Sequence, residues 1–486
     1  MKADCRSDFF CISVPFLILT VLLVVACVCL KVSCRSQDRP EHPNVLLITI
    51  DTLRADHLGC YGYRLPTSSN IDRLAKYGVL FSDCTVQWPL TWPSMASMNT
   101  GAYPKTTGIE HKLSVLPDSF YMMAEIFKGA GYATGAVVAN FTVGRKYGFS
   151  QGFDHFVESW QEMWEKEQGN VPIVHDSRIL KKYTNATIVT DQALAWLAQI
   201  KEARPFFLWL HYMDPHGPYI PPLEYRAFFR DAHESMDVPL SDIPRYQRRG
   251  KKEGPITDLG FYKTEYDREI RYLNDEVGRL FAELSWQGLD ANTLIVFTAD
   301  HGESLDENDY YLEHGKLPYQ PSAHIPLILV QKGVLPSGKT IKHPVGLIDL
   351  SATVLDFAGI DIPASFEGHS LRDLILGDQE SPKPEYVFMR SGKGTEMTVR
   401  SGKWKLIHFQ TRKSNENQFE LYDIHDDPYE RIDVASENPE LVRTLSRVLQ
   451  EWYTGGPRFA ERGKEIDIDS LDENSREMLR SLGYIK

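Results

Sequence analysis

The chain has 486 residues, of which 42% are hydrophobic and 24% are charged. This composition is typical of a folded protein with a large apolar core, so it excludes a mainly disordered chain. The formal net charge of -13 argues against a nucleic-acid-binding protein, because such a protein needs clustered Lys and Arg to neutralise phosphates. We therefore expect a globular protein whose partners do not include nucleic acid.

An uncharged apolar run covers residues 9–30, after a short tail at residues 1–8. It matches the ~20 residues that a helix needs to cross a bilayer, and a polar linker follows at residues 31–43. The run predicts a membrane-anchored protein whose main domain is extracytoplasmic, either periplasmic or extracellular. Two alternatives stay open: a cleaved signal peptide, and a bacterial lipoprotein with the lipid on Cys27. In a eukaryotic secretory pathway, Asn140 would begin a glycosylation sequon.

Beyond the linker, strand-like and helix-like segments alternate. Continuous apolar runs of the kind found in buried parallel strands lie at residues 45–50, 205–211 and 293–298. Segments with one apolar face predict helices at residues 69–78, 191–200 and 266–284. This alternation predicts an α/β fold with a largely parallel sheet and helices on both of its faces.

Near residue 360 the pattern changes to short strands separated by turns. Such strands are predicted at residues 386–389, 398–400, 404–407 and 419–422, before a helix at residues 439–452. We therefore predict a main α/β domain at residues 44–360 and a smaller α+β C-terminal subdomain at residues 361–486.

Acidic residues follow two of the predicted strands. Asp51 comes directly after the strand at residues 45–50, and Asp300 and His301 follow the strand at residues 293–298. A side chain at the carboxyl end of a parallel strand points into the crevice where open α/β sheets bind ligands. The alternative for a single such Asp is a helix N-cap, but two strands of one pattern favour a site. Carboxylates with one imidazole suit a divalent cation such as Ca, Mg, Mn or Zn.

Two further candidate residues lie in predicted turns. His216 stands between Pro215 and Gly217 after a strand. We expect this loop to hold the imidazole out of the core, which makes His216 a candidate proton donor. Thr91 precedes Pro93 where a helix is predicted to begin, and the positive end of the helix dipole stabilises an alkoxide or a bound oxyanion. The alternatives are a structural His216 and a Thr91 that only caps the helix, and the local sequence does not decide between them.

Four segments together resemble the motifs of the sulfatases, members of the alkaline phosphatase superfamily. These segments are residues 44–62 (NVLLITIDTLRADHLGCYG), 89–104 (PLTWPSMASMNTGAYP), 214–219 (DPHGPY) and 298–304 (TADHGES). Residues 404–407, 420–423 and 427–430 resemble the C-terminal subdomain of the family. The resemblance runs from residue 44 to the end and implies an alkaline-phosphatase-like fold, a mainly parallel sheet sandwiched by helices.

The resemblance also implies roles for individual residues. Asp51, Asp300 and His301 match metal ligands, and calcium is the metal that the family favours. Thr91 matches the nucleophile, and His216 matches a histidine that assists departure of the leaving group. The implied substrate is a sulfate or phosphate ester of a glycan, a lipid or a small molecule.

Two more residues are matched in position, and several depart from the family pattern. His314 and Lys316 fall near positions that contact the oxyanion of the bound ester. Typical sulfatases carry a Cys or Ser that is oxidised to formylglycine, followed by x-Pro-Ser-Arg; Thr91 does not yield this aldehyde, and Met95 replaces the Arg. Thr52 stands where many members have a second Asp ligand, and the Lys and His of the family's Gly-Lys-x-His segment are not found.

Three functions are compatible with this combination. The first is a metal-dependent hydrolase of sulfuric or phosphoric esters that uses Thr91 directly. A sulfated threonine lacks the elimination route of a formylglycine hydrate, so we expect such an enzyme to favour phosphoric esters. The second is a membrane-anchored transferase in which a lipid or glycan acceptor replaces water, and the third is a sulfatase-like protein without turnover. The retained acids and histidines favour the hydrolase.

Overall fold

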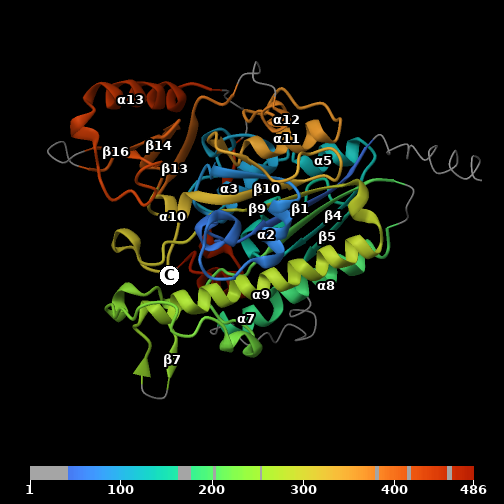
Figure 1. The fold of residues 1–486 in the computed structure, drawn as a ribbon, viewed down its shortest axis with the longest axis horizontal. Helices are drawn as coiled ribbons and strands as arrows, with labels where there is room; N and C mark the ends of the chain where they lie inside the picture. The colour runs from blue at the N-terminus through green and yellow to red at the C-terminus, as the bar shows by residue number, and fades with distance from the viewer. Residues whose placement is uncertain are drawn as a thin grey trace, which may run out of the picture. The chain divides into compact units, whose positions relative to one another are not determined.

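A nine-stranded sheet forms the centre of the computed structural model (Figure 1), in the order β11-β2-β10-β9-β1-β6-β4-β5 with β12 beside β2. The structure describes residues 42–161, 177–200, 204–251, 254–377, 383–412, 418–456 and 462–485. The strands are β1 (Asn44–Ile50), β2 (Val79–Thr85), β4 (Ala133–Val138), β5 (His155–Glu158), β6 (Phe206–Tyr212), β9 (Thr293–Ala299), β10 (His324–Val330), β11 (Lys339–Ile341) and β12 (Val345–Gly346). Within this sheet β10 runs antiparallel to both of its neighbours, and the other pairings are parallel. The predicted mainly parallel sheet is confirmed.

Helices cover both faces of the sheet (Figure 1). One group packs together and contacts β4, β6 and β10: α2 (Ser69–Lys76), α8 (Ala186–Leu197) and α9 (Leu259–Trp286). A second group comprises α3 (Thr91–Thr100), α5 (Met123–Gly129), α11 (Asp349–Phe357) and α12 (Arg372–Leu376). Further helices are α4 (Pro104–Thr107), α7 (Ser177–Thr184), α10 (Gln320–Ala323) and α14 (Glu473–Ser481). The helix predicted at residues 191–200 begins earlier than expected, because the Asn185 side chain caps it by accepting the Ile188 N–H.

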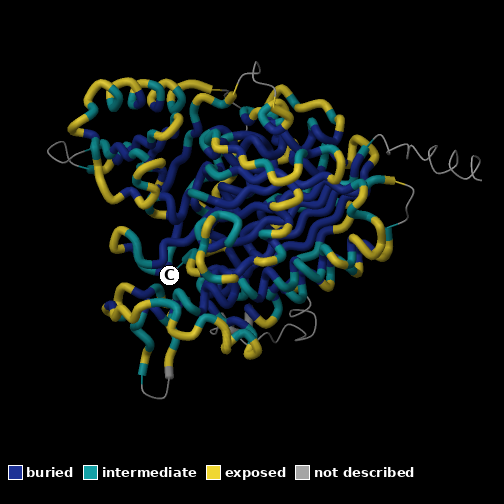
Figure 2. Tube along the Cα trace, in the orientation of Figure 1, coloured by how far each residue is buried: buried dark blue, intermediate teal, exposed yellow. Residues whose placement is uncertain are grey.

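The central strands are mainly apolar and are buried along almost their whole length, because helices cover both sides of them. Every residue of β6 and β9 is buried, and so is every residue of β1 after Asn44. Figure 2 shows these strands in dark blue, while the exposed surfaces lie mainly on the outer helices and loops. Continuous apolar runs, rather than alternating ones, are what a doubly covered parallel sheet requires.

The C-terminal part adds a second, antiparallel sheet of four strands in sequence order. The strands are β13 (Val387–Ser391), β14 (Glu396–Ser401), β15 (Trp404–Phe409) and β16 (Phe419–Asp423), and α13 (Pro439–Thr454) packs on β14 and β15. The predicted α+β character of this part is confirmed. The exact division of the chain at residue 360 stays a prediction.

The sheet register brings the predicted acidic residues to one edge. Ile50, the last residue of β1, pairs with Tyr212 of β6 and with Ala299 of β9. Since these strands are parallel, Asp51 and Asp300 leave the sheet side by side at its carboxyl edge. This is the edge at which open α/β sheets bind ligands.

The predicted membrane-anchored localisation is corrected. In the part of the chain that the structure describes, no helix combines the length and the apolar character that crossing a bilayer requires. The apolar run at residues 9–30, on which the prediction rested, lies outside the described residues.

Candidate active site

Thr91 lies at the start of α3 with its side chain fully buried. The N-cap position is held by Leu90, with no capping bond from a side chain, so the interpretation of Thr91 as a helix cap is wrong. Its hydroxyl oxygen Oγ1 instead lies 3.2 Å from His301 Nε2 and 2.9 Å from the phenol oxygen of Tyr484. The hydroxyl therefore faces the carboxyl edge of the sheet.

Asp51 and Asp300 lie beside Thr91, both fully buried. Asp300 Oδ1 accepts the backbone N–H groups of Thr52 and His301, at 3.1 and 2.7 Å. Asp51 Oδ2 accepts a hydrogen bond of 2.6 Å from the Asn140 amide. The second oxygen of each carboxylate, Asp51 Oδ1 and Asp300 Oδ2, has no hydrogen-bond partner. Two buried carboxylate oxygens without donors are costly unless a cation satisfies them.

Two histidines direct ring nitrogens that carry lone pairs toward these carboxylates. His301 Nδ1 lies 2.8 Å from the Gly302 carbonyl. Because a carbonyl only accepts hydrogen bonds, Nδ1 carries the proton and Nε2 carries a lone pair. Nε2 lies 3.5 Å from Asp300 Oδ2. His211, the penultimate residue of β6, places Nδ1 2.9 Å from Thr49 Oγ1, while its Nε2 has no partner and lies 3.7 Å from Asp51 Oδ2. His301 is thus where the sequence predicts it, whereas His211 was missed although it lies near the end of a buried strand at the same edge.

This group of side chains fits a divalent metal ion. Ligand atoms of Asp51, His211 and Asp300 all lie within 4.8 Å of one another, and His301 Nε2 lies 3.9 Å from Asp51 Oδ1. Two carboxylates with one or two imidazoles are the donors that Zn, Mn and related cations accept, while Ca and Mg favour the oxygens.

The charges of this cluster depend strongly on burial. Burial, followed by the negative charge of Asp51, raises the pKa of Asp300 to about 6. Burial also opposes ionisation of Asp51, but the imidazoles of His216, His211 and His301 outweigh it and hold the pKa of Asp51 well below its usual range. One of two adjacent carboxylates is therefore hard to ionise without a cation between them.

His216 joins the cluster from the loop after β6. Its Nδ1 lies 2.7 Å from the Gly217 carbonyl, so Nδ1 carries a proton and the buried Nε2, which has no partner, carries the lone pair. Burial lowers the pKa of His216 to about 4. Asp214 holds the loop in place by accepting bonds of 2.6 Å from both Lys181 Nζ and the Ala186 N–H.

His314 also lies in the cluster, between two other imidazoles. Its ring centroid is 4.4 Å from that of His301 and 5.3 Å from that of His216. Its Nδ1 lies 2.9 Å from Glu303, whose other oxygen accepts the Tyr219 hydroxyl at 3.0 Å. Glu303 was not predicted as a site residue, although it stands in the same segment as Asp300 and His301.

Lys316 is not brought into the cluster. Its side chain is 64% exposed, and its ammonium pairs with Glu313 at 2.5 Å. The expected contact between Lys316 and a bound ester stays a prediction that requires this side chain to turn inward.

Asn140 and Tyr484 complete the cluster, and sequence reasoning missed both. Asn140 follows β4 and is fully buried, so its sequon offers no accessible glycosylation acceptor in this fold. Its amide nitrogen bonds both Asp51 and the Tyr484 phenol, the latter at 2.8 Å. Tyr484 lies three residues after α14, and no periodicity or motif in the sequence points to it.

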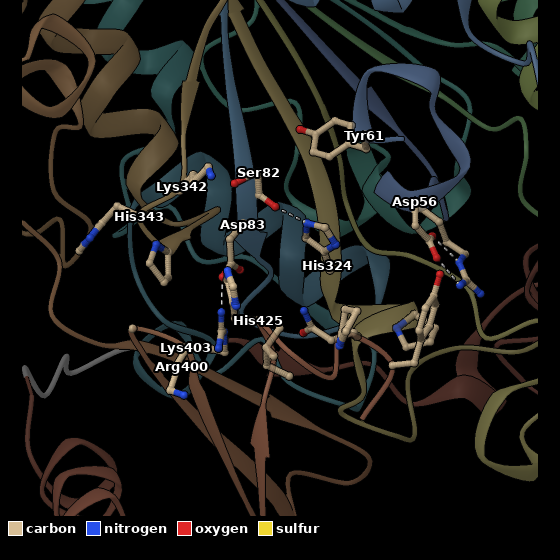
Figure 3. Close-up of a pocket in the computed structure, with 18 residues that line it drawn as sticks. Asp56, Tyr61, Ser82, Asp83, His324, Lys342, His343, Arg400, Lys403 and His425 are labelled. Atoms are coloured by element: carbon tan, nitrogen blue, oxygen red, sulfur yellow. Dashed lines mark hydrogen bonds and ion pairs between the residues drawn. The ribbon is translucent and has the colours of Figure 1, made fainter. Parts of the chain in front are cut away.

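A separate cavity of about 770 Å³ lies between the large sheet and the C-terminal sheet (Figure 3). Ser82 and Asp83 of β2 and His324 of β10 line one side, and Arg400 of β14 reaches across to form an ion pair with Asp83. None of the residues of the candidate active site is among those that line it. The cavity is therefore distinct from the cluster around Thr91.

Family models and known proteins match this chain over most of its length. The model described as Sulfatase matches residues 43–360, and that described as N-sulphoglucosamine sulphohydrolase, C-terminal, matches residues 309–453. The ulvan-active sulfatase of Formosa agariphila is 26% identical over 447 residues, which cover 88% of this chain and 83% of the relative.

Solved structures share the fold. One, in complex with its substrate D-glucosamine-2-N,6-O-disulfate, is 20% identical with a TM-score of 0.68, covering 85% of this chain and 98% of the other. The phosphonate monoester hydrolase of Agrobacterium radiobacter is 20% identical with a TM-score of 0.65, covering 85% and 96%. The predicted alkaline-phosphatase-like architecture is confirmed. Since the sulfatase model alone spans more than half of the sequence, the chain belongs to the sulfatase family, whose hydrolases act on sulfate esters.

Proposed function

We propose that this chain is a metal-dependent hydrolase that cleaves the sulfate ester of a glycan through a covalent intermediate on Thr91. The observation that carries the proposal is the position of Thr91 Oγ1, buried and 3.2 Å from His301 Nε2 at the edge where Asp51 and Asp300 each keep one oxygen without a partner. A hydroxyl beside a cation site is the arrangement that activates an otherwise weak nucleophile.

Asp51 and Asp300 would hold the metal, with an imidazole from His301 or His211, and calcium is our first choice. When bound, the cation lowers the pKa of the Thr91 hydroxyl and offsets the negative charge of the ester. The rest of the chemistry falls to side chains of the chain itself.

In the first step the Thr91 Oγ–sulfur bond forms and the bond between sulfur and the leaving oxygen breaks. The departing alcohol takes a proton from His216, and the proton of the Thr91 hydroxyl passes to solvent, from which His216 is later protonated again. In the second step water attacks the sulfur, Oγ regains a proton, and hydrogen sulfate leaves. Burial lowers the pKa of the free His216 to about 4, so we expect the bound anionic ester to raise that pKa, so that Nε2 takes up the proton that it later donates.

The choice of a glycan is supported by the relatives. One acts on ulvan according to its name, and one solved structure holds a disulfated glucosamine as its substrate. These properties belong to those proteins, and we extend them to this chain as part of the proposal.

A phosphoric or phosphonic ester is the second candidate substrate. The observation that favours it is Thr91 itself, because threonine does not form the formylglycine hydrate whose elimination releases sulfate. A phosphonate monoester hydrolase is also among the structures with the same fold.

The test uses the full chain with Ca, Mg, Mn or Zn added in turn. 4-Nitrophenyl sulfate, glucosamine 6-sulfate, 4-nitrophenyl phosphate and 4-nitrophenyl phenylphosphonate are compared for wild type, Thr91→Ala and the control Thr444→Ala, an exposed threonine of α13. We expect turnover in wild type and the control and a loss of about 10³-fold or more in Thr91→Ala. Full activity of Thr91→Ala would refute the nucleophile, and inertness of wild type toward every ester with every metal would refute the hydrolase.

A further inference from the structure

The segment after α14 carries Tyr484 into the candidate active site. The ring of Tyr484 packs edge-on against Trp92, the residue after Thr91, with centroids 5.4 Å apart at 82°. Its phenol oxygen lies 2.9 Å from Thr91 Oγ1 and 2.8 Å from Asn140 Nδ2. A residue near the end of the chain thus touches the proposed reacting atom.

The hydrogen bonds of Asn140 leave the Tyr484 proton available for Thr91. Asn140 Oδ1 accepts both the N–H and the hydroxyl of Thr142, so its amide nitrogen faces the site. That nitrogen donates to Asp51 Oδ2 and to the Tyr484 oxygen. A phenol has one proton, and since Tyr484 accepts from Asn140, its own proton is free to be donated to Thr91.

Donation from Tyr484 in turn orients the Thr91 hydroxyl. Thr91 Oγ1 accepts from Tyr484, so its own hydrogen points away from the phenol, and His301 Nε2 lies 3.2 Å from the same oxygen. The chain of donated hydrogen bonds that we infer therefore runs from Asn140 through Tyr484 to Thr91.

The fold holds the Tyr484 segment in this place by several contacts. Met478 and Leu479 of α14 are buried, and the Tyr484 N–H donates to the Leu479 carbonyl at 2.9 Å. Gly483 has a φ of +81°, and a Cβ at this position would lie 2.5 Å from the Tyr246 ring. Only glycine suits both the left-handed backbone and the close approach, so the turn that aims Tyr484 at Thr91 is specific.

We propose that Tyr484 is a positioning residue for the Thr91 nucleophile. Its phenol fixes Thr91 Oγ1 at the carboxyl edge and stabilises the negative charge that develops on this oxygen as it attacks. The inference rests on the proposed function of Thr91. According to this proposal, the segment that carries Tyr484 takes part in the reaction directly. The site is then incomplete without the last described residues of the chain.

The experiment removes only the phenol oxygen. Tyr484→Phe keeps the ring packing on Trp92, and Tyr386→Phe is the matched control, because its hydroxyl bonds the surface residue Glu385. Both variants are made in the full chain and assayed with Ca and 4-nitrophenyl sulfate or 4-nitrophenyl phosphate, whichever wild type turns over. We expect kcat of Tyr484→Phe to fall by about 10- to 100-fold while KM changes less than about threefold, and Tyr386→Phe to match wild type.

A second variant, deletion of residues 484–486, separates positioning from simple coverage. Thr91 is fully buried, so a segment that only closed the site would release activity when removed. We expect the deletion to lose at least as much kcat as Tyr484→Phe. A rise in kcat for either variant, or an unchanged kcat in Tyr484→Phe, would overturn the inference while leaving the proposed function intact. Inert wild type, or an active Thr91→Ala, would refute the proposed function and this inference with it.

Discussion

The amide nitrogen of Asn140 lies 2.6 Å from Asp51 Oδ2 and joins the end of β4 to the end of β1. The contact leaves Asp51 Oδ1 without a partner and free to face a cation. Asn140 thereby orients a proposed metal ligand, and this role can be measured.

We predict that Asn140→Ala weakens metal binding by about 10- to 100-fold, because partners that orient a ligand contribute that much to affinity. Isothermal calorimetry with Ca and Mn measures the affinity of the folded variant. Asn438→Ala is the control, since Asn438 lies just before α13, where its amide donates to the Val434 carbonyl. An Asn140→Ala protein with wild-type affinity would show that the contact does not serve the metal.

Metal should stabilise the fold through the two strand-end carboxylates. A ligand that binds only the folded state adds about 2.7 kcal/mol to the free energy of unfolding at 100 times its Kd. We therefore expect the Tm of wild type to be higher with Ca than in EDTA. The Tm of Asp300→Ala should be the same in both conditions.

The matched control for this measurement is Asp290→Ala, which removes a carboxylate that pairs with Lys332 at the surface. It should respond to Ca as wild type does. The same measurement on His211→Ala and His301→Ala identifies the imidazole ligand. The histidine whose replacement abolishes the rise in Tm with Ca is the ligand. An equal shift in Asp300→Ala and wild type would contradict the proposed ligand set.

The neutral, buried His216 should make the protein sensitive to acid. Burial lowers its pKa in the folded state from 6.5 to about 4. As the pH falls through 6.5 toward 4, the unfolded chain takes up a proton before the folded one does, so the free energy of unfolding decreases. At pH 4.5 this amounts to about 2.5 kcal/mol relative to pH 7.5.

Urea unfolding in EDTA at the two pH values measures this loss. We expect His216→Gln to lose about 2.5 kcal/mol less than wild type on acidification, because glutamine has no proton to take up. His425→Gln, at a side chain that is 80% exposed, should lose as much as wild type. Identical losses in wild type and His216→Gln would show that His216 is not held neutral.

Two neighbouring lysines of the C-terminal sheet should differ sharply in their contribution to stability. Lys405 pairs with Glu430 at 2.6 Å and both side chains are fully buried, whereas Lys403 pairs with Asp423 with its own side chain 49% exposed. Removing one partner of a buried pair leaves an uncompensated charge and costs about 3 to 5 kcal/mol, while an exposed pair contributes about 0 to 1 kcal/mol.

Lys405→Met is therefore expected to lower the free energy of unfolding by about 3 kcal/mol or more, and Lys403→Met by less than about 1 kcal/mol. Urea denaturation monitored by tryptophan fluorescence gives both values. The double variant Lys405→Met/Glu430→Leu should recover most of the loss, because no charge is then left unpaired. Equal effects of the two single variants would refute the assignment.

Much of the fold could be predicted because its signals are local. The apolar runs of β1, β6 and β9 are continuous, since both faces of each strand are covered, and such runs are visible without any tertiary information. The residue at which a helix begins is harder to predict from the sequence. The helix predicted at residues 191–200 begins at Ala186 because the Asn185 side chain caps it, and Asn is also favoured in turns.

The sequence by itself determined that Asp51 and the Asp300-His301 pair follow parallel strands, and so that they meet at one edge of the sheet. Only the tertiary structure decided what completes the site. Tyr484 and Thr91 are separated by 393 positions, and Asn140 and His211 enter through the register of other strands. Lys316, close to His314 in sequence, turns to the surface instead. Strand ends are set by short-range periodicity, whereas a hydrogen bond between distant segments depends on how the whole core packs, and no local pattern records it.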